Sequence, residues 1–193
     1  MRRRGIPAAL ALVALLGACT SGGTDDEPPA PETAASAASV LDPCPEQLDE
    51  PAAGAGAVPA LAFDCLGGGS LDLTRAPGVP TVVNLWGSWC APCRQELPLL
   101  QDLADAAGDR VRVLGVISRD GEPQAESFAQ DAGITFPSAF DGDGELMAEI
   151  GLNALPYTFF LAADGTLAHT EVGPVDTVAE LQGLVTEHLG VQL

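Results

Sequence analysis

The chain has 193 residues, enough for one domain with a sizeable core, and it carries 27 acidic residues against 8 basic ones. The formal net charge of −19 repels phosphate backbones, which argues against nucleic-acid binding and gives no help in docking to anionic lipid. One acidic globular domain is therefore the expected architecture.

The first 18 residues are typical of an export signal. Arg2–Arg4 form a positively charged start, and Ile6–Leu16 form an apolar run that is too short to span a bilayer. Leu-Gly-Ala then precedes Cys19, an order that resembles the lipobox of bacterial lipoproteins, in which the cysteine is lipidated and becomes the N-terminus. We expect a signal peptide over 1–18 and a lipid anchor on Cys19, with a plain secretory signal as the alternative.

The segment from Cys19 to residue 43 is rich in Ser, Thr, Pro, Ala and acidic residues, with almost no large apolar side chains. This composition predicts a flexible linker between the lipid anchor and the folded part. We expect the folded domain to occupy residues 44–193.

Short strands open the predicted domain. Leu61–Phe63 and Leu71–Leu73 are predicted to pair across a turn at Gly67–Gly69. Thr81–Trp86 is β-branched and apolar, as expected of a buried central strand. After the next loop, leucines at helical spacing predict a helix that ends at Gly108.

The rest of the chain alternates strand-like and helix-like segments. In chain order they are a strand at Val111–Ile117, a helix at Glu122–Ala132, a short strand near Phe136–Phe140, a short helix around Leu146–Ile150, a hairpin of Thr158–Leu161 and Leu167–Val172, and a helix at Val175–Leu189. A βαβ centre followed by a hairpin and a helix predicts an α/β fold with a mixed sheet and helices on both faces.

Cys90 and Cys93 stand three residues apart, where the buried strand gives way to the helix. The unpaired backbone N–H groups and the dipole of the first helical turn favour a negative sulfur at Cys90. Cys93 lies about one turn further on the same helix face, close enough to form a small disulfide ring. The pattern favours a redox pair in which Cys90 attacks and Cys93 resolves the mixed disulfide.

Two other interpretations of this pair are weaker. A structural zinc site needs four Cys or His ligands, and the chain has no second CxxC and only two histidines, His169 and His188. A purely structural disulfide of this size would constrain little of the unfolded chain.

The remaining cysteines of the domain are Cys44 and Cys65. Four cysteines allow three pairings, and the sequence alone leaves them open. Adjacency favours Cys90 with Cys93, which leaves Cys44 with Cys65. Such a bridge would be a structural staple worth about 3 kcal/mol, with a second, electron-relaying redox pair as the alternative.

These motifs together resemble the thioredoxin superfamily, and within it the membrane-tethered TlpA/ResA-like thiol–disulfide oxidoreductases. The resemblance covers about residues 61–189 and rests on Val83–Trp86, Trp89–Arg94, Glu96–Pro98 and Ala154–Phe159 followed by Asp164-Gly165. It implies a thioredoxin-like fold with an N-terminal β extension and a strand-and-helix insertion within residues 117–151. No cofactor or metal is expected.

The resemblance also implies roles for single residues. It implies a cis peptide before Pro156, with Trp89, Leu155 and Pro156 forming the surface that holds a substrate. Glu96 is the candidate proton acceptor or donor for Cys93. The alternative is a solvated glutamate that is stabilised by the helix dipole.

We therefore expect an enzyme that exchanges thiols and disulfides in exported proteins at the outer face of the cell membrane. The resemblance favours reduction of substrate cysteines, such as those of apocytochrome c, by electrons from a membrane thiol donor. Disulfide formation is the main alternative. A thiol peroxidase would need a Thr and an Arg poised around Cys90, and a copper carrier has only His169 as a distal ligand. A monomer is expected.

Overall fold

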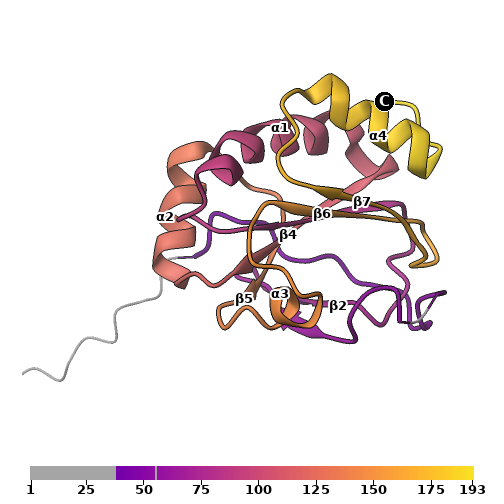
Figure 1. Cartoon of the computed structure of the whole chain (residues 1–193), viewed down its shortest axis with the longest axis horizontal. Helices are drawn as coiled ribbons and strands as arrows, with labels where there is room; N and C mark the ends of the chain where they lie inside the picture. The colour runs from indigo at the N-terminus through magenta and orange to yellow at the C-terminus, as the bar shows by residue number, and fades with distance from the viewer. Residues whose placement is uncertain (1–37, 55) are drawn as a thin grey trace, which may run out of the picture. The chain divides into compact units, whose positions relative to one another are not determined.

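The computed structural model describes residues 38–54 and 56–193, so the expected signal peptide, Cys19 and residues 20–37 lie outside the described residues. The described part is built on a five-stranded sheet with strand order β5–β4–β3–β6–β7 (Figure 1). Its strands are β3 (Thr81–Trp86), β4 (Arg112–Ser118), β5 (Ser138–Asp141), β6 (Tyr157–Leu161) and β7 (Leu167–Val172).

β3 is the central strand, and all six of its side chains are buried. Its apolar and β-branched residues suit a strand that is covered on both faces. β3 runs parallel to β4 and antiparallel to β6, β5 runs parallel to β4, and β7 pairs antiparallel with β6. The expected mixed sheet is confirmed.

The helices that pack around this sheet are α1 (Ala91–Ala107), α2 (Glu122–Ala132), α3 (Glu145–Glu149) and α4 (Val178–Leu189). α1 and α4 lie side by side on one face of the sheet, whereas α3 lies on the other face (Figure 1). α4 begins three residues later than its apolar pattern predicted, because the Thr177 side chain accepts a hydrogen bond from the Glu180 N–H and caps the helix there. α2, β5 and α3 all lie within residues 117–151, where the resemblance implied an added strand and helix.

A small hairpin of β1 (Ala62–Asp64) and β2 (Ser70–Asp72) packs on the same face as α3. The residue after β1, Cys65, forms an antiparallel bridge to Ala139 of β5. The hairpin thereby covers the edge strand β5, which would otherwise offer unpaired backbone groups.

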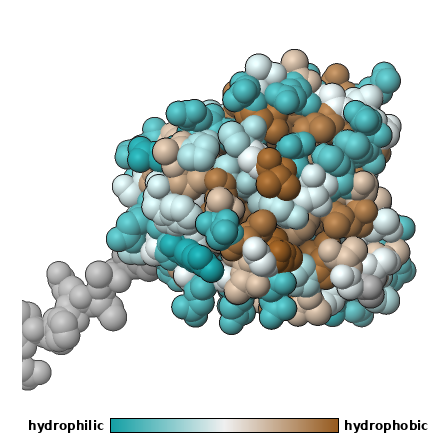
Figure 2. Space-filling model, in the orientation of Figure 1, coloured by the Kyte–Doolittle hydropathy of each residue, from teal (hydrophilic) through white to brown (hydrophobic). Residues whose placement is uncertain are grey.

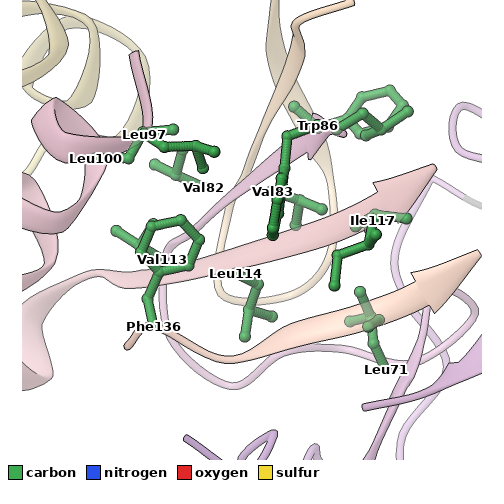
Figure 3. Close-up of a cluster of buried hydrophobic side chains, with 14 of the residues drawn as sticks. Leu71, Val82, Val83, Trp86, Leu97, Leu100, Val113, Leu114, Ile117 and Phe136 are labelled. Atoms are coloured by element: carbon green, nitrogen blue, oxygen red, sulfur yellow. The ribbon is translucent and has the colours of Figure 1, made fainter. Parts of the chain in front are cut away.

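The core fills both sides of β3 (Figure 3). Leu97 and Leu100 of α1 approach the sheet beside Val82, and Leu71 of the hairpin lies near Ile117 on the opposite side. All of these side chains are buried. The alternation of β3 side chains between two apolar layers fixes which of its residues face α1.

The segment of residues 39–44 corrects the expected domain boundary. We predicted a flexible linker up to residue 43, but Leu41 is 3% exposed and the Asp42 N–H donates to the Thr135 carbonyl at 2.7 Å. Ser39 donates to the Glu126 carboxylate of α2. The turn of the hairpin packs so closely here that a Cβ on Gly67 would lie 2.2 Å from the Leu41 carbonyl oxygen. Burial of apolar surface and these backbone contacts outweigh the polar composition of the segment as a whole.

Within the part of the chain that the structure describes, no helix has the length and hydropathy that a membrane crossing requires. The signal-like apolar run lies outside that part.

Candidate active site

Cys90 is the N-cap residue of α1, and it is joined to Cys93 by a disulfide. The Cys90 sulfur accepts a hydrogen bond from the Cys93 backbone N–H at 3.2 Å. Pro92 occupies the first turn, where its missing N–H costs nothing. Cys90 is 3% exposed and Cys93 is fully buried. A sulfur in this position meets free amides and the positive end of the helix dipole, which stabilise a thiolate.

The loop that precedes Cys90 is held by the end of β4. The Ser88 backbone N–H and hydroxyl both donate to the Asp120 carboxylate, at 2.5 and 3.1 Å, and the Trp89 indole N–H donates to the Ser118 carbonyl at 3.3 Å. A Cβ on Gly87 would lie 2.6 Å from the Trp89 indole nitrogen, so glycine is needed there. Our sequence reasoning missed Asp120. Its position just after β4 could have indicated it, because β3 and β4 are parallel and their carboxyl ends meet at one edge.

Large apolar side chains are exposed at Trp89, the chain neighbour of Cys90, and at Val172 of β7. Trp89 is 53% exposed, and the Leu155–Pro156 peptide is cis, as the resemblance implied. Val172, 69% exposed, lies opposite Tyr157 in the sheet register. Leu155 is largely buried and offers little area to a partner. Figure 2 shows one face of the molecule, on which hydrophilic and hydrophobic residues are interspersed.

A groove of about 440 Å³ opens beside the start of α1. It is lined by Ser88 and Arg94 on one side and by residues of α2 on the other, which are Pro123, Gln124, Ser127, Phe128 and Asp131. The Arg94 guanidinium lies over the Phe128 ring at 5.0 Å, so it stacks on an aromatic face and is more than a solvated cation.

Glu96 lies three residues after Cys93, and the structure buries it to 1% exposure. One carboxylate oxygen accepts from the Asn84 side-chain amide at 3.0 Å and the other from the Val175 N–H at 3.0 Å. Burial raises the pKa of Glu96, and the nearby charge of Glu171 adds to the rise, while the two hydrogen bonds oppose it. The alternative of a solvated first-turn glutamate is wrong, because this side chain points into the core.

Two further polar side chains complete the layer beneath α1. The Asn84 amide also donates to the Thr158 hydroxyl at 2.8 Å, so both of its protons are used. Its carbonyl oxygen has no hydrogen-bond partner among the described residues. Trp86 is fully buried, as expected, and packs against Phe128 with ring centroids 6.1 Å apart. Thr158 was missed because its position in the apolar run of β6 gave no signal.

The second cysteine pair, Cys44 and Cys65, is also joined by a disulfide, across 21 residues. The Cys44 N–H donates to the Gly68 carbonyl, and the Cys65 N–H donates to the Gly69 carbonyl. The bridge ties residues 39–44 to the hairpin, and neither cysteine stands at the start of a helix.

In the described residues, no group of three or more His, Cys, Asp or Glu side chains is placed to hold a metal ion. His169 and His188 lie face to face, with ring centroids 3.9 Å apart and planes 6° apart. Metals bind imidazole nitrogens in the ring plane, so this stacked pair does not converge on a common point.

Comparison with known proteins places this geometry in a family. The family model for Redoxin matches residues 52–185. Sporulation thiol-disulfide oxidoreductase A of Bacillus subtilis is 35% identical over 102 residues, which are 51% of this chain and 62% of that protein. The match therefore spans less than two thirds of the length of that relative.

Similar solved structures include thiol–disulfide oxidoreductases as well. A secreted disulfide oxidoreductase of Mycobacterium tuberculosis, described as homologous to E. coli DsbE, superposes with a TM-score of 0.58 at 28% identity, covering 66% of this chain and 96% of the other. The pneumococcal exposed lipoprotein thioredoxin (Etrx1) of Streptococcus pneumoniae gives 0.55 at 26% identity, covering 64% and 96%. The chain therefore belongs to the redoxin family, and the proteins that it is similar to include thiol–disulfide oxidoreductases.

Proposed function

We propose that this protein is a lipid-anchored, extracytoplasmic enzyme that reduces cysteines of exported proteins through the Cys90–Cys93 pair. The observation that carries the proposal is the cysteine sulfur at the N-terminus of α1, next to a resolving cysteine. The exposed Trp89, the chain neighbour of Cys90, offers an apolar docking surface. A secreted oxidoreductase and an exposed lipoprotein among the similar structures support the location.

The reaction begins from the reduced pair. The Cys90 thiolate attacks one sulfur of a substrate disulfide, which forms a Cys90–substrate mixed disulfide and releases one substrate thiolate. Cys93 then loses its proton, and its thiolate attacks the Cys90 sulfur. The second substrate thiolate leaves and the Cys90–Cys93 disulfide forms, so two electrons pass from the pair to the substrate.

Glu96 is the proposed acceptor of the Cys93 proton in that second step. It lies on the same face of α1 as Cys93, and no solvent reaches it. A carboxyl group with a raised pKa is a stronger base than a surface carboxylate, which suits it to take a proton from a buried thiol.

The proposed substrates are exported proteins with oxidised cysteine pairs, for which apocytochrome c is the leading candidate, and a membrane thiol protein is the proposed electron donor. The lipid on Cys19 would keep the domain near that donor. Replacement of Cys19 by alanine is expected to release the protein from the membrane fraction.

The direction of electron flow is tested by the reduction potential of the Cys90–Cys93 couple, measured against glutathione in Cys44→Ala/Cys65→Ala protein and in wild type. A potential near −270 mV, the thioredoxin value, supports a reductant. A potential near −120 mV would instead assign disulfide formation. In cells, Cys93→Ser should trap substrates as mixed disulfides on Cys90, and their identity tests the apocytochrome proposal.

A further inference from the structure

A row of polar side chains leads from the buried Glu96 to the edge of the sheet. In the register, Asn84 of β3 lies opposite Thr158 of β6, and Thr158 lies opposite Glu171 of β7. Directly opposite residues of antiparallel strands share a face, with Cβ atoms about 5 Å apart. Asn84 faces α1, because its amide binds Glu96, so Thr158 and Glu171 face that side too.

Glu171 ends this row at the surface. Its side chain is 34% exposed, on the edge strand β7. Four residues after Glu171, the Val175 N–H donates a hydrogen bond to the Glu96 carboxylate, so this part of the chain lies against Glu96. A second carboxylate therefore lies beside the first, at the boundary between core and solvent, where charges are only partly screened.

His169 holds Glu171 from the other side. Its Nε2 atom lies 3.3 Å from a Glu171 carboxylate oxygen, and its ring stacks on His188 of α4 and packs near Phe160. The titratable groups around Glu171 are thus Glu96 of α1, His169 on its own strand and, stacked on His169, His188 of α4. The contact with His169 fixes the position of the Glu171 carboxylate.

We propose that Glu171 is a positioning residue for the resolving step: its charge, held in place by the His169 contact, sets how readily Glu96 takes the proton of Cys93. The proposal rests on the proton-acceptor role proposed for Glu96. The negative charge of Glu171 disfavours a second negative charge nearby and makes Glu96 the stronger base.

The test reads Glu96 directly, by carbon NMR of its carboxyl group across a pH titration. In Glu171→Gln we expect its titration midpoint to fall by about half a pH unit. The matched control is Glu187→Gln, which removes the same charge from an exposed position on α4 and should leave the midpoint unchanged. A midpoint in Glu171→Gln equal to that in the control overturns the proposal.

Two further measurements keep the test sharp should Glu171→Gln fail to fold. In wild type, 1 M salt should screen Glu171 and lower the Glu96 midpoint, whereas an unchanged midpoint contradicts the proposal. In a cycle with His169→Gln, the two substitutions should be non-additive because the two side chains are in contact and His169 acts by holding Glu171. Additive shifts would show that His169 does not act through Glu171 and would overturn that part of the proposal.

The failure of this proposal is distinct from failure of the one before it. The pH dependence of mixed-disulfide resolution in Glu96→Gln tests the proton-transfer role, and a profile identical to wild type would overturn that role. An absent NMR shift in Glu171→Gln overturns only the control that Glu171 exerts.

Discussion

The two disulfides of this domain are similarly buried, but they differ in the length of the loop that they close and in the elements that they join. Cys44 and Cys65 are 8% and 7% exposed, and Cys90 and Cys93 are 3% and 0% exposed. The first pair closes 21 residues and ties an N-terminal segment to a hairpin, whereas the second closes three residues at a helix N-terminus. Accessibility alone therefore does not separate a structural bridge from a reactive one.

The difference lies in what surrounds the sulfur and what the loop constrains. Around Cys44–Cys65 the hydrogen bonds run between backbone groups, and the long loop removes entropy from the unfolded chain. At Cys90 a backbone N–H points at the sulfur itself, and the small loop removes little entropy. We infer that the first bridge stabilises the fold and the second carries electrons.

The largest expected effect is the loss of exchange in Cys90→Ser. Removing the attacking sulfur should lower the rate of thiol–disulfide exchange by roughly a thousandfold or more, the scale of losing a nucleophile. Insulin reduction by turbidity measures it, and the thermal unfolding temperature serves as the check on folding. Retention of most activity would show that Cys90 is not the attacking sulfur, and it would contradict the redox role inferred for the Cys90–Cys93 disulfide.

The complementary change is Cys44→Ala/Cys65→Ala. Opening the longer loop should lower the free energy of unfolding by about 3 kcal/mol, as measured by urea denaturation. Exchange by the folded fraction should continue at the wild-type rate. An enzyme that keeps its stability but loses exchange would show that this pair relays electrons.

A smaller loss of stability is expected from Leu41→Ala. Leu41 is a buried residue of the segment that the Cys44–Cys65 bridge holds in place. Its truncation should therefore lower the free energy of unfolding by about 2 kcal/mol. Asp42→Ala, at an exposed position of the same segment, is the control. In the double-cysteine variant the cost of Leu41→Ala should shrink, because the segment is no longer held. An equal cost in both backgrounds would uncouple the segment from the bridge.

The smallest expected effect is the pH dependence of stability contributed by Glu96. Its pKa in the folded protein lies above the ordinary value of 4.5, so the folded state binds this proton more tightly than the unfolded chain does. That stabilisation is complete below pH 4.5 and is lost as pH rises through the raised pKa. The Glu96→Gln variant stays neutral at every pH. Its free energy of unfolding should therefore rise relative to that of wild type as the pH increases from 4.5 to the raised pKa.

Urea denaturation at a series of pH values measures this difference. Glu187→Gln, on the exposed surface of α4, is the matched control and should run parallel to wild type. A constant difference between Glu96→Gln and wild type across the series would mean that Glu96 titrates normally.

Much of this arrangement could be predicted from sequence. Thr81–Trp86 was predicted as a buried central strand because its apolar, β-branched run admits few alternatives, and Cys90 and Cys93 follow it with a spacing that few other sites share. The order of the later elements predicted the mixed sheet. These features depend on local pattern.

The features that the sequence did not predict depend on contacts between distant segments. Leu41 is buried in a segment that contacts the hairpin turn and α2, whereas its polar neighbours predicted a linker. Strand register places Thr158 and Glu171 in line with Asn84, which binds Glu96, and no local pattern specifies that register. Asp120 joins the site because two parallel strands end together.

The most direct test of the account is the rate at which each cysteine is alkylated in fully reduced protein at neutral pH, mapped by mass spectrometry. The account predicts that Cys90 reacts first and faster than a free cysteine in an unstructured peptide, because the helix N-terminus stabilises its thiolate. Alkylation of Cys90 at the rate of the free cysteine, or after Cys44 and Cys65, would contradict it.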